Sequence, residues 1–355
     1  FVLVEGAGSP AEVNLRPGDI ANMGFALATG TPVILVGDID RGGVIAQIVG
    51  TKAVLSPADS SAVQGFVVNK FRGDPTLFQD GYDLIADLTD WPGLGLVPWL
   101  GAASQLPAED SLDLPERAKT AGSLHVACLV LPRIANFDDL DPLRMEPNVK
   151  LSLVEAGAAL PRDTDIAIIP GSKSTIADLQ FLYDQGWDID LKAHARRGGR
   201  ILGLCGGYQM LGMSISDRAA IEGSGGKIAG LGLLDVTTAI SPQKTLAEVS
   251  ATHLGSGTTL EAYEMHMGQT QGADCEQPFA LIGERSDGAV SQDGKVIGTY
   301  LHGLFASDPF RAWYLAESRT LSRLNYEASV ETALNQLAAN IEAHLDVDRL
   351  IGLAA

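Results

Sequence analysis

The chain has few cysteines, and their placement argues against two kinds of site. Cys128, Cys205 and Cys275 are the only three among 355 residues, and no two of them form a CxxC pair. Cysteines so far apart favour neither a disulfide framework nor a zinc site. Because a chain without structural disulfides suits a reducing environment, we expect the cytoplasm as its compartment.

Long apolar runs are also missing from the sequence. None reaches the roughly 18 residues that a helix needs to cross a bilayer. The start of the chain does not combine a basic stretch with an apolar one, as a secretory leader does. The sequence therefore predicts no membrane partner. It opens with Phe1 instead of Met, inside an apolar stretch, so we expect an N-terminal piece to precede it.

Basic residues are in the minority. Lys and Arg number 25 against 44 Asp and Glu, and the net charge is −19. The phosphates of nucleic acid would be repelled by such a chain, so we expect no nucleic-acid partner. An acidic small substrate remains compatible, because basic groups in one pocket can dominate locally. Solubility alone is a sufficient reason for the overall charge.

The length predicts two domains, because one core of ordinary size does not hold 355 residues. In the first, residues 1–115, short β-branched apolar runs alternate with helical patterns. Strands are expected at 1–4, 32–36, 63–68 and 94–98, and helices at 43–55 and 78–88. This alternation is typical of a parallel sheet wrapped by helices and predicts an α/β fold.

A polar, proline-broken stretch at 101–122 marks the expected domain boundary. A second α/β domain is expected at 123–320. Its strands are predicted at 125–131, 150–154, 165–169, 200–204, 232–240, 258–267 and 295–301, and its helices at 175–185 and 191–197. Residues 321–355 are predicted as a separate helical segment, because apolar residues recur there every three or four positions.

Cys205 stands at a sharp turn between a strand and a helix. The apolar run 200–204 leads directly into it, Gly206 and Gly207 follow, and a helical pattern starts at once. Such a turn strains the backbone of the nucleophile, and small neighbours permit it. A helix N-terminus also favours the thiolate, the reactive form of cysteine. We predict that Cys205 is a catalytic nucleophile; the alternative is a buried structural cysteine.

Six histidines are candidates for the base that this nucleophile needs. His302 follows an apolar strand pattern and precedes Gly303, so it should reach the rim of the sheet where Cys205 lies. His266, within 263–268, is the second candidate, and its alternative role is that of a structural histidine between strands. We predict that His302 is the base.

Backbone amides are needed to stabilise the oxyanion of the reaction. One donor should be the amide of Gly206, next to the nucleophile. The loop 170–175, which follows a strand and opens a helix, offers a second at Gly171. The alternative for this loop is an ordinary helix cap by Ser172 or Ser174.

Polar residues also follow the strands of the first domain. Glu5 ends the first strand and is a candidate ligand for Mg²⁺. Asp38 and Asp40 are candidates for cofactor binding, and Arg41 for a phosphate or a substrate carboxylate. A surface Asp–Arg pair explains these three equally well. Asn69 resembles the asparagine that contacts the base in related nucleotide sites.

Several motifs together resemble one known family. Those of the second domain are LCGGYQML (204–211), PGSKST (170–175), YEMHMG (263–268) and YLHGLF (300–305). They look like the glutaminase domain of the cobalamin-pathway amidotransferases. Five others are similar to the cobyric acid synthases in particular: VEGAGSPAE (4–12), VGDIDRGG (36–43), VNKFRGD (68–74), LPAEDS (106–111) and LPRIANFDDLDPL (131–143). The resemblance spans nearly the whole chain.

This resemblance implies a specific reaction and fold. The synthetase domain would have a nucleotide-binding fold like that of dethiobiotin synthetase, incomplete here, followed by a class I-like glutamine amidotransferase domain. ATP and Mg²⁺ would activate the b, d, e and g carboxylates of adenosylcobyrinic acid a,c-diamide, a corrinoid. Ammonia from glutamine would then give adenosylcobyric acid. The resemblance assigns the catalytic pair to Cys205 and His302 and the metal to Glu5.

Two features depart from related enzymes. Triad glutaminases carry a glutamate two residues beyond the catalytic histidine. This chain has Leu304 at that position, and the family it resembles also lacks the glutamate. No G-x-x-x-x-G-K-[ST] phosphate loop occurs in the sequence. The family's loop lies upstream of the segment matching 4–9, so we expect it in the preceding piece. Without that loop, we expect this chain not to bind ATP tightly.

Alternative functions remain open at this point. A sister enzyme would amidate the a and c carboxylates of cobyrinic acid, or a cell-wall lipid. A protein of another class would be a non-catalytic scaffold, against which the Cys205 turn argues. The sequence does not indicate an oligomeric state.

Overall fold

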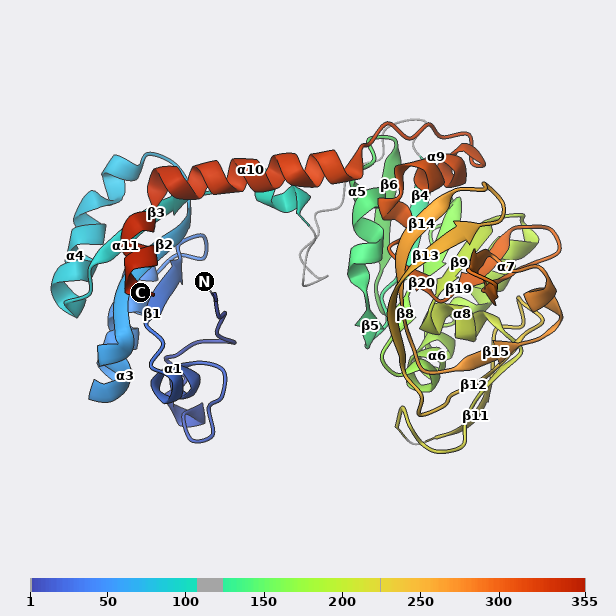
Figure 1. The fold of residues 1–355 in the computed structure, drawn as a ribbon, viewed down its shortest axis with the longest axis horizontal. Coiled ribbons are helices and arrows are strands. Elements are labelled where there is room, and N and C mark those ends of the chain that lie inside the picture. The colour runs from blue at the N-terminus through green and yellow to red at the C-terminus, as the bar shows by residue number, and fades with distance from the viewer. Residues whose placement is uncertain (1, 107–123, 224, 355) are drawn as a thin grey trace. The chain divides into compact units, whose positions relative to one another are not determined.

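The computed structural model describes residues 2–106, 124–223 and 225–354 (Figure 1). The chain divides into two compact units, Phe1–Leu106 with Val330–Ala355, and Pro107–Ser329. Most of the predicted boundary region and of the LPAEDS motif lies outside the described residues. The predicted α/β architecture is present in both units.

The first unit is built on a three-stranded parallel sheet with the order β1-β2-β3. Its strands are β1 (Val33–Asp38), β2 (Val63–Phe71) and β3 (Gly93–Pro98); its helices include α1 (Met23–Thr29), α2 (Val44–Val54), α3 (Pro57–Ala62) and α4 (Gln79–Thr89), with short 3-10 turns at Val13–Leu15, Pro75–Phe78 and Gly101–Gln105. These confirm the strands predicted at 32–36, 63–68 and 94–98 and both helices. Buried residues of α2 and α4, including Ile48 and Ile85, pack against Phe66 and Val68 of β2.

The strand predicted at 1–4 is wrong in the part that the structure describes. Val2–Val4 have no regular structure and are exposed, Leu3 to 96%. Apolar residues favour a strand only where a neighbouring strand pairs with them, and no described strand pairs with this segment.

The C-terminal segment contains α10 (Tyr326–His344) and α11 (Val347–Leu353). Helix was predicted here, and the observed contacts group Val330–Ala355 with the first unit. Figure 1 shows α10 and α11 of this segment in red. Leu345 and Leu350 pack on the sheet face opposite the one that α2 and α4 cover. Their partners there are Val67, Leu94 and Val97. These two leucines thus cover part of a sheet face that would otherwise meet water.

The second unit is built on a six-stranded sheet with the order β18-β19-β9-β7-β4-β6, parallel except for β18. Its strands are β4 (Leu124–Leu129), β6 (Val149–Val154), β7 (Ile166–Ile169), β9 (Arg200–Leu204), β18 (Ala289–Val290) and β19 (Val296–Thr299). Every residue of β4, β7, β9 and β19 is buried. Both faces of this sheet are covered, which is why these strands read as continuous apolar runs.

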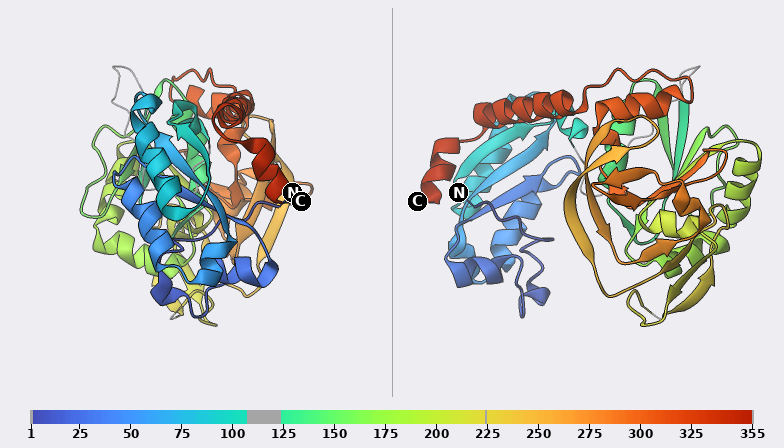
Figure 2. Two further views of the ribbon diagram at one scale, coloured as in Figure 1. Left: turned by 90° about the vertical axis from the view of Figure 1, so that its left-hand side faces the viewer. Right: turned by 45° about the vertical axis from the view of Figure 1, so that its right-hand side comes forward.

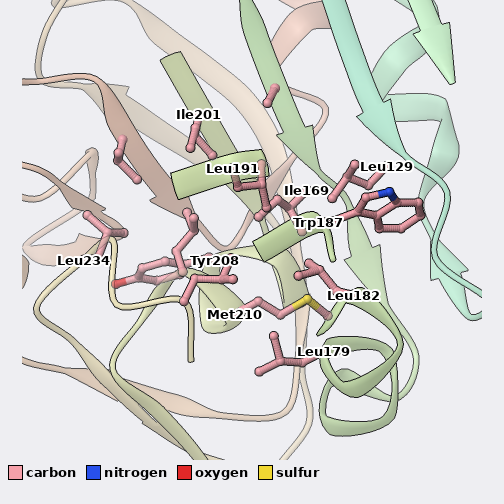
Figure 3. Close-up of a cluster of buried hydrophobic side chains, with 14 of the residues drawn as sticks. Leu129, Ile169, Leu179, Leu182, Trp187, Leu191, Ile201, Tyr208, Met210 and Leu234 are labelled. Carbon is pink, nitrogen blue, oxygen red and sulfur yellow. The ribbon is translucent and has the colours of Figure 1, made fainter. Parts of the chain in front are cut away.

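Helices cover one face of this sheet. They are α6 (Thr175–Asp184), α7 (Trp187–Arg196) and α8 (Gly206–Leu211). Figure 3 shows their apolar side chains, Trp187 and Met210 among them, meeting Leu129, Ile169 and Ile201 of the sheet. This core fixes α8 against β9, so the residue between them has little freedom to move.

The other face packs against a five-stranded sheet of order β17-β16-β13-β14-β20 and against α9 (Figure 2). These elements are β13 (Thr245–His253), β14 (Thr259–His266), β16 (Ala280–Ile282), β17 (Arg285–Asp287), β20 (Leu301–His302) and α9 (Asp308–Ala316). Smaller elements are α5 (Asp141–Met145), β5 (Ile134–Ala135), β8 (Gly171–Ser172), β10 (Ser214–Asp217), β11 (Gly226–Ala229), β12 (Thr237–Ala239) and β15 (Gln269–Gln271), with 3-10 turns at Phe137–Leu140, Ala273–Glu276 and Leu304–Ala306. The strand predicted at 232–240 shortens to β12. No helix in the described ranges is both long and apolar enough to span a bilayer.

Candidate active site

Cys205 occupies the predicted turn between β9 and α8. Its backbone has φ 50° and ψ −105°, a strained conformation for a residue other than glycine. Glycines make the turn possible, because a methyl group at Gly207 would lie 2.0 Å from the Ile169 carbonyl oxygen. The Cys205 amide donates to the Thr299 carbonyl at 2.8 Å, which ties the turn to β19.

The thiol of Cys205 is nearly buried and faces β14. Its Sγ donates a hydrogen bond to the Met265 carbonyl oxygen at 3.2 Å. Only 8% of the residue is exposed. A thiol held at one point beside a cavity, on a backbone that cannot relax, suits a nucleophile better than a packing residue.

His302 lies at the end of β20 and is fully buried. Its Nε2 makes no hydrogen bond within the described part of the chain. Burial alone would lower the pKa of His302, but the Asp139 carboxylate and the Cys205 thiol outweigh it and raise that pKa to about 10. A protonated imidazole beside a thiol favours the thiolate.

Asp139 contacts this histidine, and the sequence analysis did not identify it. Its Oδ2 accepts from His302 Nδ1 at 2.7 Å, and its Oδ1 accepts from the Gly303 amide at 2.6 Å. Asp139 belongs to the 3-10 turn Phe137–Leu140, within the NFDDLDP segment that carried part of the family resemblance. The acidic run in that segment was the available signal, but nothing local links it to a histidine 163 residues away.

His266, the second candidate base, has a different environment. Its ring stacks on Tyr300 with centroids 3.9 Å apart and an interplanar angle of 19°. Its Nε2 lies 3.6 Å from Glu264 Oε1. Burial, the largest influence, lowers the pKa of His266, and Cys205 is not among the groups that affect it. This arrangement fits the structural alternative.

A cavity of about 590 Å³ opens beside Cys205. Lys173, Lys244 and Glu222 bring charge to its wall, and Gln209 brings an amide. Glu222 Oε2 accepts from the Thr175 amide at 2.6 Å, at the start of α6. Burial, as the largest influence, raises the pKa of Glu222. The cavity therefore offers both signs of charge to a zwitterionic ligand.

Two amides of the loop 170–175 are candidate partners of Gly206 in an oxyanion hole. Ala135 pairs with Gly171 in the antiparallel β5–β8 ladder, and the Lys173 amide donates to the Arg133 carbonyl at 2.9 Å. Because N–H directions alternate along a strand, this register turns the Gly171 amide toward β5 and the Ser172 amide away from it. A methyl group on Gly206 would lie 2.9 Å from the Ser172 nitrogen, so that amide faces the turn.

In the first unit, the predicted residues gather at the carboxyl ends of β1 and β2. Asp38, the last residue of β1, pairs with Asn69 in the sheet register. Lys70 Nζ lies 2.8 Å from Asp38 Oδ2 and holds the pKa of that carboxyl below its usual value. Arg72 Nε lies 2.7 Å from Asp40 Oδ1. Both predicted acids are thus engaged in ion pairs.

The other residues predicted in the first unit are less constrained. The Asn69 side chain accepts from the amide of Lys70 at 2.8 Å. Arg41 is exposed near Asp38, and Glu5 is exposed at the edge of a cavity of about 410 Å³. Within the described residues, no three His, Cys, Asp or Glu side chains group closely enough to hold a metal ion.

The strand-to-helix turn at Cys205, the buried His302 and a cavity large enough for an amino acid are features expected of a glutamine amidotransferase. Residues 125–310 match the profile of the CobB/CobQ-like glutamine amidotransferase domain. Among solved structures, PurLQS from Thermotoga maritima is similar with a TM-score of 0.39 and 17% identity, covering 61% of this chain and 99% of that chain. The assignment rests on closer relatives.

Those relatives identify the family. Over 354 residues the chain is 60% identical to the cobyric acid synthase of Paracoccus denitrificans (strain Pd 1222), covering 100% of this chain and 73% of that protein. Over 357 residues it is 58% identical to a cobyric acid synthase of Rhodobacter capsulatus, covering 100% of this chain and 74% of that one. The chain belongs to the cobyric acid synthase family, a group of glutamine-dependent amidating ligases of cobalamin biosynthesis, with glutamine as the ammonia donor.

Proposed function

We propose that this protein uses ATP and glutamine to amidate the b, d, e and g carboxylates of adenosylcobyrinic acid a,c-diamide, giving adenosylcobyric acid. The supporting observation is the identity of 60% to a cobyric acid synthase over the whole chain, which includes the first unit as well as the glutaminase. The relatives matched at 56–60% identity over the whole chain are cobyric acid synthases, which favours this substrate over the a and c carboxylates or a cell-wall lipid.

The glutaminase reaction uses the groups around Cys205. Its thiolate attacks the carboxamide carbon of glutamine and forms a C–S bond. The C–N bond then breaks, and the His302 imidazolium gives its proton to the departing ammonia. Water attacks the thioester, His302 takes a proton from that water, and the C–S bond breaks to release glutamate. The raised pKa of His302 supports its starting as the imidazolium.

Two backbone amides are proposed to hold the oxyanion that forms during both attacks. Gly206 was predicted as one donor, and its place at the first position of α8 leaves its amide free of an intrahelical partner. We favour the Ser172 amide as the second, in place of that of Gly171. The β5–β8 register supports this choice, because it directs the Gly171 amide to Ala135.

The charged residues of the cavity wall are proposed to bind the α-ammonium and α-carboxylate groups of glutamine. Glu222 would pair with the α-ammonium, and Lys173 and Lys244 would attract the α-carboxylate. Their placement with Cys205 around one cavity supports this assignment. A cavity of about 590 Å³ is large enough for an amino acid, since ligand pockets begin near 300 Å³.

The synthetase reaction is proposed for the first unit, with a nucleotide-binding fold like that of dethiobiotin synthetase. ATP would phosphorylate a corrinoid carboxylate, and ammonia would displace the phosphate. Mg²⁺ would neutralise the nucleotide's phosphates, and Glu5 fits as a ligand because Mg²⁺ needs only one or two carboxylates beside them. Asn69 is proposed for the base and Arg41 for an anionic group. The ion pairs of Asp38 and Asp40 favour a structural role for both.

Replacing the nucleophile tests the proposal. Cys205→Ala should abolish glutamine hydrolysis by this chain. In a protein of the full length of its relatives, of which this chain covers 73%, it should abolish glutamine-dependent amidation, while free ammonia at high concentration still supports amidation. Cys275→Ala, which alters a half-buried cysteine away from the cavity, is the matched control and should leave glutaminase activity unchanged. Mass spectrometry of the corrinoid product counts the amides added. Glutamine hydrolysis by the Cys205→Ala protein, or amidation of cobyrinic acid but not of its a,c-diamide, would overturn the proposal.

A further inference from the structure

We propose that Asp139 is the positioning residue of His302, in the role that a glutamate two residues beyond the histidine has in triad glutaminases. The acid thus comes from the 3-10 turn Phe137–Leu140, far upstream of the histidine in the sequence. This inference rests on the proposed roles of Cys205 and His302.

The contact has the geometry of an orienting carboxylate. One oxygen of Asp139 accepts from His302 Nδ1 at 2.7 Å, and the other accepts from the neighbouring Gly303 amide at 2.6 Å. Two points of attachment fix the plane of the carboxylate relative to the ring. With the Nδ1 proton directed at Asp139, only Nε2 remains to exchange a proton at the thiol.

Burial makes this contact strong. The His302 and Asp139 side chains are 1% and 3% exposed, so water does not screen the charge between them. Asp139 is the leading group that raises the pKa of the ring against the effect of burial. The other groups facing His302 are the Cys205 thiol, the Tyr263 ring stacked on it at 5.1 Å, and the exposed carboxylate of Asp138.

The position of the usual glutamate offers no alternative. Leu304 is 1% exposed and packs in the apolar core beneath the catalytic edge. A leucine there neither accepts a proton nor leaves space for a carboxylate from another element. Asn136 of the same segment donates to Tyr263 Oη at 2.6 Å, which ties the segment to the ring stacked on His302.

A purely structural role for Asp139 predicts different results. In that case the carboxylate would only anchor the Gly303 amide, and an isosteric amide would serve as well. Asp139→Asn separates the two roles, because its Oδ1 still accepts from Gly303 while its NH₂ group cannot accept from His302 Nδ1–H. The ring would then turn or change tautomer, and the imidazolium would lose its counter-charge.

The test is a pH titration of the Cys205 thiolate, followed by its ultraviolet absorbance and by the rate of alkylation with iodoacetamide. Cys205→Ser supplies the blank. In Asp139→Asn the thiolate should appear only at higher pH than in the unaltered protein. The kcat for glutamine hydrolysis should fall by roughly 10²- to 10⁴-fold with little change in KM, the range expected for an orienting acid and its base. Asp293→Asn, at an exposed turn outside the cavity wall, is the control and should change neither.

The unaltered protein gives a second measurement that does not depend on a variant folding. With ¹⁵N-labelled histidine, the His302 Nδ1–H proton should resonate far downfield, and the signal should vanish in His302→Gln. An unchanged thiolate titration in a folded Asp139→Asn protein, or the absence of that resonance, overturns the role of Asp139. Glutaminase activity in Cys205→Ser would show that Cys205 is not the nucleophile, and would instead overturn the proposed function.

Discussion

Two buried histidines lie near the same cavity, and their surroundings shift their pKa values in opposite directions. His302 faces a carboxylate and the thiol, which together raise its pKa to about 10. His266 lies flat on Tyr300, and burial lowers its pKa. We therefore expect His302, and not His266, to be the base that faces Cys205 as an imidazolium. The second contributes its ring as a packing surface.

His302→Ala should therefore lower the turnover of glutamine by roughly 10²- to 10⁴-fold, the usual contribution of a general acid–base group. His266→Ala removes a stacked ring but no proton carrier, so its loss should be much smaller. Steady-state measurement of glutamate release for both variants checks this. The larger loss in His266→Ala would show that the base is misassigned.

Whether a site residue could be predicted depended on how far along the sequence its partner lies. Cys205 and His302 each follow a strand within their own stretch of sequence, so a local pattern was enough to select them. Asp139 lies in a turn with three aspartates within four residues, and no local pattern tells which of them faces inward. Asp139 is distinguished from its neighbours only by the packing of the 3-10 turn against β20. Neither segment's sequence alone predicts that packing.

The turn between β9 and α8 depends on close backbone approach. A methyl group at Gly203 would lie 2.6 Å from the Leu211 side chain, and one at Gly207 would lie 2.0 Å from the Ile169 carbonyl. The strain at Cys205 persists because both neighbouring elements are buried and cannot retreat. The whole turn, rather than the cysteine alone, holds the thiol in the position expected of a nucleophile.

Gly207→Ala should consequently displace α8, abolish most glutaminase activity and destabilise the second unit by about 1–3 kcal/mol, as overpacking of a core does. Gly50→Ala is the control, because nothing lies within 4 Å of the added methyl group in the middle of α2. It should stabilise the first unit by up to about 1 kcal/mol, since alanine favours helix over glycine. Urea unfolding of both variants gives the two free energies. Equal effects would contradict the close approach at Gly207.

Among the helices and strands, the sequence predicted buried elements better than exposed ones. The four strands with every residue buried were predicted, because both faces carry apolar side chains. β13 was missed: five of its nine residues are exposed, so its pattern resembles a loop. The short helices α1 and α3 were missed as well. Val2–Val4 were assigned to a strand on composition, which does not report whether a partner strand is present.

Across the whole molecule, each unit has its own buried core. His253 and Asp287 in the second unit are buried groups whose shifted pKa values bear on its stability in mild acid. Burial lowers the pKa of His253 to about 4, among the rings of Phe279, Phe310 and Trp313. Burial also raises the pKa of Asp287 to about 6, against a hydrogen bond of 2.5 Å from Thr299. Both shifts act between pH 4 and pH 6.5, with opposite signs.

The signs follow from which state binds more protons. The folded pKa of His253 lies below its usual 6.5, so in mild acid the unfolded chain takes up the proton and the free energy of unfolding falls. The folded pKa of Asp287 lies above its usual 3.8, so the folded chain takes up the proton there and that free energy rises. The two contributions oppose each other in the intact protein.

Removing one group at a time should expose the other. His253→Phe keeps a ring in the aromatic cluster and removes the acid-sensitive group, so the free energy of unfolding should fall less from about pH 7 to about pH 5 than in the unaltered protein. Asp287→Asn removes the compensating group, so that free energy should fall more. Urea unfolding at both pH values, followed by tryptophan fluorescence, gives the two differences. Each variant is compared with itself at the two pH values, so the constant cost of the substitution cancels. Changes of the same sign in both variants would show that one of the two buried groups titrates near its ordinary pKa.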